Sequence, residues 1–134
     1  MRDSEVFEIN ILLVMIGGFF GAICRFALGE WIHTNNGFPF GTFIINLIGC
    51  FILGWFLTYV SQNKRIRPEF TLIIGTGFIG SFTTFSTFSV ETLNLFQNGL
   101  IFTAILYVLA STVLGIGLAY AGHNLAISRK REVM

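Results

Sequence analysis

The sequence contains very little charge. Only 11% of its 134 residues are Asp, Glu, Lys or Arg, whereas a soluble domain has roughly 25%. Hydrophobic residues make up 54%, and the mean hydropathy is +0.76. A domain of this size buries only about two-thirds of its unfolded surface, so in water it would expose much of this apolar material. The shortage of charge therefore excludes an ordinary soluble enzyme and predicts an integral membrane protein.

Other features exclude further classes. The net charge of +1 provides no basic face for the phosphates of nucleic acid, and a chain poor in charge and rich in aromatics is the opposite of a disordered one. Cys24 and Cys50 have no Cys or His partner at ligand spacing, so we interpret them as small buried hydrophobic residues. The sequence has no Ser–His–Asp set, no HExxH motif and no paired carboxylates in an apolar stretch. It therefore predicts that the protein is not an enzyme.

The few charges leave four long uncharged stretches, at residues 9–24, 31–63, 70–90 and 92–128. A helix that crosses a bilayer needs about 20 mostly apolar residues. The stretches therefore predict four spans, at approximately residues 9–28, 40–60, 70–96 and 101–122. The connections between them are short, so residues 1–134 are expected to form one all-α, four-helix membrane domain.

The positions of Lys and Arg predict an orientation. Seven of them fall on one side of the predicted bundle, and the other two loops have none; the seven are Arg2, Lys64, Arg65, Arg67, Arg129, Lys130 and Arg131. Arg25 is the exception, near the far end of the first span. Because Lys and Arg collect in cytoplasmic loops, both termini are predicted to be cytoplasmic, in a protein of the cell membrane.

The third span contains an unusual run of glycines and hydroxyl residues, GTGFIGSFTTFSTFS, from Gly75 to Ser89. It includes G-x-G-x-x-G, but a dinucleotide site also needs a preceding strand in a soluble βαβ unit, which this chain cannot supply. Glycines followed by hydroxyls make a poor continuous helix, so a break near Gly80–Phe82 is predicted. Such a break exposes carbonyls that suit a small cation and a helix N-terminus that suits an anion. The alternative is a kinked helix packed closely on a neighbour.

Aromatic side chains follow the predicted break at a regular spacing. Phe82, Phe85 and Phe88 recur every three residues and so share one helix face. The edge of an aromatic ring is the positive end of its quadrupole, so ring edges could line a path for a small, hard anion. The hydroxyl residues between them, including Thr84 and Ser86, favour a polar surrounding. The alternative is an ordinary face of Phe packed on protein or lipid.

Two further polar features lie deep in the predicted spans. Asn46 lies in the middle of the second span, where it needs either a partner on another helix or a pore. In the fourth span, Thr103, Tyr107 and Ser111 recur every four residues and form a row of hydroxyls on one face. Single hydroxyls in helices commonly bond back to their own carbonyls, but three in register favour a polar track. Glu91, near the end of the third span, could tune a vestibule or face water.

Three segments in chain order resemble the Fluc/CrcB fluoride channel family. They are GG-x-x-GA-x-x-R from Gly17 to Arg25, P-x-GT-x-x-x-N-x-x-G from Pro39 to Gly49, and G-x-x-G-x-x-TTFSTFS-x-E from Gly77 to Glu91. The resemblance covers essentially the whole chain, and the TTFSTFS run with its upstream N-x-x-G is highly specific.

The resemblance implies an arrangement and a set of functional residues. Subunits of the family pair as an antiparallel dimer, with fluoride pores along the interface and a structural Na⁺ at its centre. Backbone carbonyls of Gly80 and Thr83 would hold the Na⁺, and Arg25 and Glu91 would lie in a vestibule. The fluoride pathway would include Asn46, Thr84, Phe85, Ser86, Phe88, Tyr107 and Ser111.

Two departures from the family pattern bear on this arrangement. Gly115 occupies the next position of the hydroxyl row, where relatives often have a hydroxyl residue. Members that insert in both orientations should show little bias in Lys and Arg, yet this chain has seven on one side. The bias therefore favours pairing with a second, oppositely inserted paralogous subunit. Small residues such as Gly17, Gly21 and Gly54 could serve either dimerisation or packing within the subunit.

The function expected from these features is passive, selective export of cytoplasmic fluoride, which lowers its toxic concentration in the cell. A small multidrug exporter is the rival transporter, but it needs a carboxylate deep in the membrane, and Glu30 and Glu91 lie toward span ends. An accessory membrane subunit is the other alternative. It fits the composition but leaves Asn46 and the Phe/Thr run unexplained.

Overall fold

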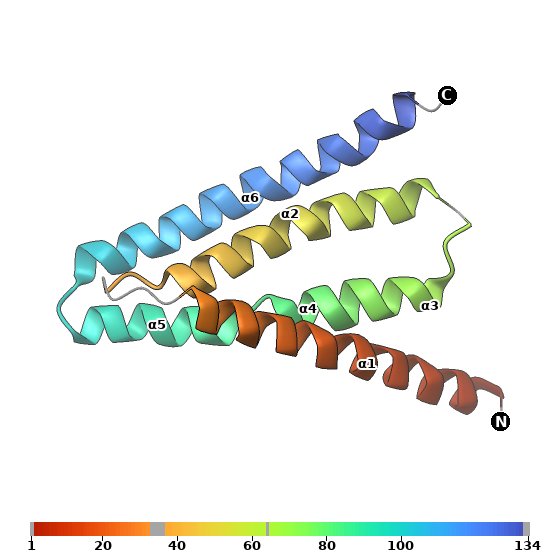
Figure 1. The fold of residues 1–134 in the computed structure, drawn as a ribbon, viewed down its shortest axis with the longest axis horizontal. Coiled ribbons are helices and arrows are strands. Elements are labelled where there is room, and N and C mark those ends of the chain that lie inside the picture. The colour runs from red at the N-terminus through yellow and green to blue at the C-terminus, as the bar shows by residue number, and fades with distance from the viewer. Residues whose placement is uncertain (1, 33–36, 64, 133–134) are drawn as a thin grey trace.

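The computed structural model describes residues 2–32, 37–63 and 65–132, and it is all-helical over these residues (Figure 1). Four helices are long and apolar enough to cross a membrane, at Glu5–Trp31, Phe40–Gln62, Pro68–Gln97 and Ile101–Arg129. The prediction of four membrane-spanning helices is therefore confirmed. The outer helices continue past the predicted spans, because α1 covers Arg2–Trp31 and α6 covers Ile101–Glu132.

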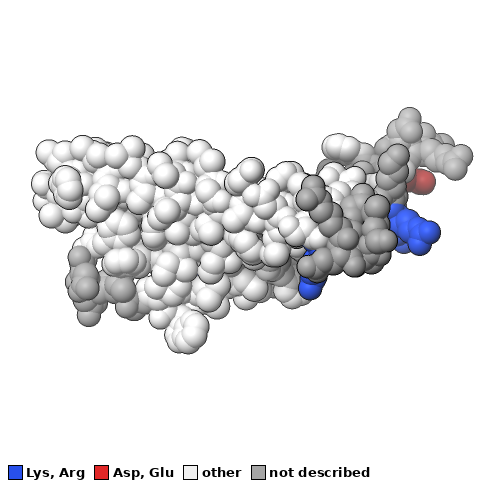
Figure 2. Space-filling view, turned by 90° about the horizontal axis from the view of Figure 1, so that it is seen from above, with Lys and Arg blue, Asp and Glu red and all other residues white. Residues whose placement is uncertain are grey.

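The helices form two pairs. α1 packs along the third span, and α2 (Phe40–Gln62) packs along α6, with both members of each pair running in the same direction (Figure 1). Both chain ends and the α2–α3 connection consequently lie at one end of the bundle. On the face seen in Figure 2, the charged side chains lie toward this same end, and the rest of the described surface is uncharged.

Glycines bring the paired helices into close contact. A Cβ on Gly17 or Gly21 of α1 would collide with a backbone carbonyl of the third span, and one on Gly77 would lie 2.7 Å from the Val14 carbonyl oxygen. A Cβ on Gly54 of α2 would likewise collide with the backbone carbonyl of Ala119 on α6. Within the subunit, these glycines therefore permit backbone contact that any side chain would prevent.

The third span is divided into four segments. They are α3 (Pro68–Thr71), the π-helix η1 (Leu72–Ile79), α4 (Gly80–Phe82) and α5 (Phe85–Gln97). In η1 the wider helical turn is evident where the Gly80 N–H donates to the Gly75 carbonyl, five residues back. Thr83 and Thr84 have extended backbone, with ψ of 156° and 125°, so they separate α4 from α5. The extended residues follow directly after the segment, Gly80–Phe82, where the sequence predicted the break.

Candidate functional site

A side-chain amide holds the extended backbone at the middle of the bundle. Asn46 Nδ2 on α2 donates to the Thr84 carbonyl at 2.9 Å, and the Thr84 N–H donates to Asn46 Oδ1 at 2.9 Å. Asn46 is half-buried and Thr84 is only 8% exposed, so each polar group needs such a partner. Asn46 Oδ1 thus gives the Thr84 N–H an acceptor in place of its helical one, and Nδ2 adds a donor to the Thr84 carbonyl.

This arrangement removes the usual donors from two carbonyls. In a continuous helix, the Thr84 N–H would donate to the Gly80 carbonyl and the Thr87 N–H would donate to the Thr83 carbonyl. Instead the first donates to Asn46 Oδ1, and the second donates to the Thr84 hydroxyl at 3.2 Å. The carbonyls of Gly80 and Thr83 therefore lose their helical partners, which leaves oxygen ligands of the kind that hard cations prefer.

The N-terminus of α5 follows immediately. Thr84 caps it, and its hydroxyl donates to Thr87 Oγ1 at 3.1 Å and lies 3.3 Å from Ser86 Oγ. The first N–H groups of a helix lack internal acceptors and carry the positive end of the helix dipole. This end of α5, with its hydroxyls, is therefore suited to a small anion.

One cavity opens beside Asn46, with a volume of about 350 Å³; we call it the Asn46 cavity. It is lined by Asn46, Gly49, Cys50, Leu53, Thr83, Thr84, Phe85, Phe88, Ser111 and Thr112. The Ser111 hydroxyl oxygen is buried and has no hydrogen-bond partner among the described residues. Phe85 is 80% exposed, and its ring centroid lies 6.0 Å from that of Phe88. The cavity is thus lined by two aromatic rings, an amide and a serine whose buried hydroxyl has no hydrogen-bond partner among the described residues.

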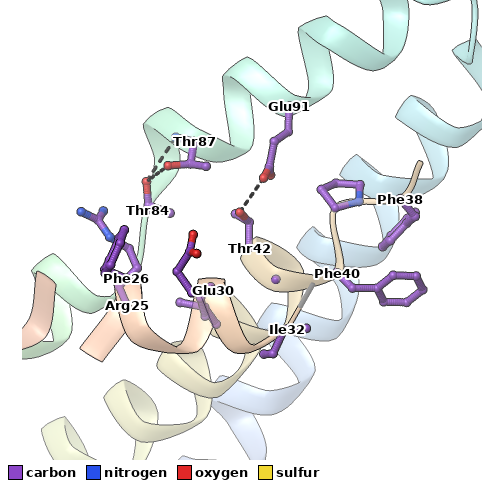
Figure 3. A pocket seen from close by; sticks show the side chains of 14 residues that line it. Arg25, Phe26, Glu30, Ile32, Phe38, Phe40, Thr42, Thr84, Thr87 and Glu91 are labelled. Carbon is purple, nitrogen blue, oxygen red and sulfur yellow. Dashed lines mark hydrogen bonds between the residues drawn. The ribbon is translucent and has the colours of Figure 1, made fainter. Parts of the chain in front are cut away.

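A second cavity, of about 460 Å³, lies on the other side of Thr84; we call it the vestibule cavity. Arg25 and Glu30 from α1 point into it, and Glu91 from α5 lies across from them (Figure 3). The Glu91 carboxylate accepts hydrogen bonds from Thr42 Oγ1 and from the Tyr107 hydroxyl, each at 2.8 Å. Two donors therefore fix the orientation of this carboxylate at the cavity wall.

The structure brings most of the predicted site residues into these two cavities. The Asn46 cavity contains the predicted residues Asn46, Thr83, Thr84, Phe85, Phe88 and Ser111, and the vestibule cavity contains Arg25, Thr84 and Glu91. Gly80 and Ser86 are exposed next to the extended residues. Tyr107 is fully buried instead, and its ring packs on Phe88, Phe38 and Phe43.

Thr42 and Cys50 are among the lining residues that were not predicted as site residues. Thr42 lies four residues before Asn46 and Cys50 lies four residues after it, so all three lie along one row of α2. That spacing is the signal that could have identified them. Thr42 binds Glu91 in the vestibule cavity, and Cys50 lines the Asn46 cavity.

Comparisons with known proteins match most of the chain to relatives of one family. Residues 12–123 match the model of the family described as CrcB-like protein, Camphor Resistance (CrcB). The chain is 58% identical over 123 residues to the fluoride-specific ion channel FluC of Oceanobacillus iheyensis, covering 92% of this chain and 95% of the relative. It is 48% identical over 119 residues to the FluC of Methanocaldococcus jannaschii, covering 89% and 95%. It is 45% identical over 124 residues to FluC 1 of Bacillus cereus, covering 91% and 86%.

Proposed function

The chain belongs to the CrcB family, and from this premise we propose that it forms a fluoride-selective channel in the cell membrane. The observation that carries the proposal is the Asn46 cavity. An anion that has lost water needs donors, and the cavity offers the buried, unpaired Ser111 hydroxyl. The exposed Phe85 ring adds an edge of positive electrostatic potential at the same place.

The proposed mechanism is a stepwise replacement of the water around fluoride. Arg25 is the one cationic side chain among the described residues that line the vestibule cavity, and its guanidinium would bind the anion there, beside the acidic Glu30 and Glu91. Beyond Thr84, the amide of Asn46, the hydroxyls near the α5 N-terminus and the edges of Phe85 and Phe88 take the place of water. The smallest halide would be favoured if it passes between the rings of Phe85 and Phe88, whose centroids lie 6.0 Å apart, because a larger anion needs more room there.

We propose that Na⁺ serves as a structural ion next to this route. The carbonyls of Gly80 and Thr83, which lack their helical donors, would hold it. Bound there, the ion supplies a fixed positive charge that stabilises carbonyls grouped at a subunit interface.

We also propose that the channel exports fluoride passively. Hydrogen fluoride enters cells as the neutral acid and loses its proton at the higher internal pH, which traps the anion. A channel lets the membrane potential, negative inside, drive the anion out. The protein therefore needs a route and selectivity, and it needs no coupled energy source.

A channel of this family would be an antiparallel dimer, and we propose that this chain pairs with an oppositely inserted subunit. Its seven Lys and Arg residues on one side favour a single orientation, with the termini cytoplasmic. Copies that all insert the same way cannot pair antiparallel in the membrane. A second subunit with the opposite charge bias removes this obstacle.

The function is tested by fluoride efflux from liposomes. To remove the limit on orientation, the chain is produced together with a copy in which the charge bias is inverted. That copy carries Lys64→Gln, Arg65→Gln, Arg67→Gln, Arg129→Gln, Lys130→Gln and Arg131→Gln at one end, which leaves only Arg2 there, and Gln97→Lys and Asn98→Lys at the other. We expect rapid efflux of fluoride without efflux of chloride or of a cationic dye. Dye efflux driven by a proton gradient, or no flux of any solute, would overturn the proposal.

Phe85→Ala is expected to lower fluoride efflux by about tenfold, because the exposed ring supplies an edge to the anion. The same substitution at Phe102 provides the matched control, since Phe102 is also 80% exposed but lies at the start of α6, away from the Asn46 cavity. Equal fluoride efflux from the two variants would show that Phe85 is not part of the fluoride pathway.

The need for a second subunit is tested in cells that lack other fluoride exporters. The chain produced alone is expected to give little resistance to fluoride, and the chain produced with its charge-inverted copy is expected to give full resistance. The inverted copy alone serves as the control for its own activity. Full resistance from the chain alone would show that it pairs with itself and would end the proposal of an unlike partner.

A further inference from the structure

α2 and α6 carry two rows of residues that face each other in register. On α2 the row is Thr42, Asn46 and Cys50, and on α6 it is Tyr107, Ser111 and Gly115. Each member of the first row is separated from its counterpart by the same number of residues, and the two helices run in parallel (Figure 1). Successive levels are about 6 Å apart along the helix axes.

The first two levels are polar on both helices. Thr42 and Tyr107 both donate to Glu91, at 2.8 Å each. One level further, Asn46 and Ser111 both line the Asn46 cavity, where the Ser111 hydroxyl is buried and unpaired. At the first level, both hydroxyls are therefore paired with the Glu91 carboxylate. At the second level, the Ser111 hydroxyl has no partner among the described residues and could donate to a ligand.

At the third level, α6 has no side chain and α2 has a thiol. Gly115 is buried, and a Cβ built on it would lie 3.3 Å from Cys50 Sγ as its one neighbour within 4 Å. Cys50 Sγ therefore lies directly against the position that a side chain of residue 115 would begin to fill. Cys50 is half-buried and lines the same cavity as the unpaired Ser111 hydroxyl.

We propose that the Cys50 thiol is the third polar contact of the anion route, supplied by α2 because α6 has glycine at that level. The proposal rests on the fluoride function and adds a residue to its pathway. An S–H group is a weak donor, and a small anion held between Ser111 and Cys50 would accept a hydrogen bond from each. Two independent observations converge on this point: the cavity wall at Cys50 and the buried hydroxyl without a partner at Ser111.

Two substitutions of nearly equal size test the proposal, and the result depends on which of the two variants has the higher fluoride efflux. Cys50→Ser keeps a donor, so fluoride efflux from the co-produced pair is expected to stay within about twofold of the unmodified protein. Cys50→Ala removes the donor, and efflux is expected to fall about fivefold. If Cys50 only fills space, the order reverses, because a buried hydroxyl without a ligand destabilises more than a methyl group. Thermal unfolding in detergent is measured for both variants.

Cys24 provides the matched control, since it is the other half-buried cysteine and lies on α1. Cys24→Ser and Cys24→Ala are expected to show equal fluoride efflux. A higher efflux from Cys50→Ala than from Cys50→Ser, or equal efflux from the two, would overturn the role of the thiol. Absence of fluoride efflux from the unmodified pair would instead overturn the proposed function, so the two failures can be told apart.

A paired substitution separates position from identity. Gly115→Ser alone brings a new side chain against Cys50 Sγ and is expected to lower efflux. Combined with Cys50→Gly, it moves the donor from α2 to α6 and removes the crowding. The double variant is expected to recover at least half of the original efflux, more than either single variant. If the double variant has an efflux no higher than that of Cys50→Gly alone, a donor on α6 cannot replace the donor on α2, which would contradict the proposal.

Discussion

Asn46→Ala is expected to abolish fluoride efflux and to lower the free energy of unfolding by about 3 kcal/mol. The substitution removes the donor to the Thr84 carbonyl and the acceptor from the Thr84 N–H, both at 2.9 Å. Thr84 is only 8% exposed, so water cannot easily replace either bond. The extended residues would then lose the contact that holds them between α4 and α5.

The measurement compares thermal unfolding and fluoride efflux of Asn46→Ala with those of Asn94→Ala. Asn94 is exposed on α5, so its substitution removes an amide of the same size from a position outside both cavities described above. Only the Asn46 variant is expected to unfold at a lower temperature. A normal unfolding temperature for Asn46→Ala would show that Thr84 is held by other contacts.

Asn46→Asp distinguishes the structural part of this role from the electrostatic part. A carboxylate can still accept from the Thr84 N–H, but when ionised it cannot donate to the Thr84 carbonyl. It also places a negative charge where the anion is proposed to pass. This variant is therefore expected to be more stable than Asn46→Ala and equally inactive in fluoride efflux.

The sequence was sufficient to predict the four membrane spans because that prediction depends on local composition alone. An uncharged stretch of about 20 residues has few alternatives to crossing a bilayer. The same reasoning showed that Asn46 needs a partner, but it could not show which one. That partner, Thr84, lies 38 residues away, so the pairing depends on how α2 and the third span pack.

Helical periodicity predicted which residues share a face but not what covers that face. Tyr107 and Ser111 lie on the row that the sequence indicated, yet Tyr107 is covered by Phe38, Phe43 and Phe88 while Ser111 borders a cavity. The π-helix is a similar case. Its wider turn lies where the glycines of α1 meet the backbone of the third span, a contact between distant segments that local propensity does not encode.

Gly21→Ala is expected to lower the free energy of unfolding by about 3 kcal/mol, although alanine is the better helix former. The added methyl group would meet the carbonyl carbon and oxygen of Phe78, which are backbone atoms and cannot rotate away. α1 would have to move away from η1 along its length. That movement would also displace Arg25, one turn further along α1, from the wall of the vestibule cavity.

Gly29→Ala is the matched control on the same helix, because a Cβ there has no neighbour within 4 Å among the described residues. It is expected to leave the unfolding temperature unchanged or to raise it slightly. The unfolding temperature of both variants is measured in dilute detergent, where subunits separate. This measurement shows whether Gly21 serves packing inside the subunit. If Gly21→Ala weakens only the association of subunits and leaves the separated subunit as stable as Gly29→Ala, the glycine belongs to an interface between subunits. Loss of stability in the separated subunit is the result that the contact between α1 and η1 requires, because that contact exists within one chain.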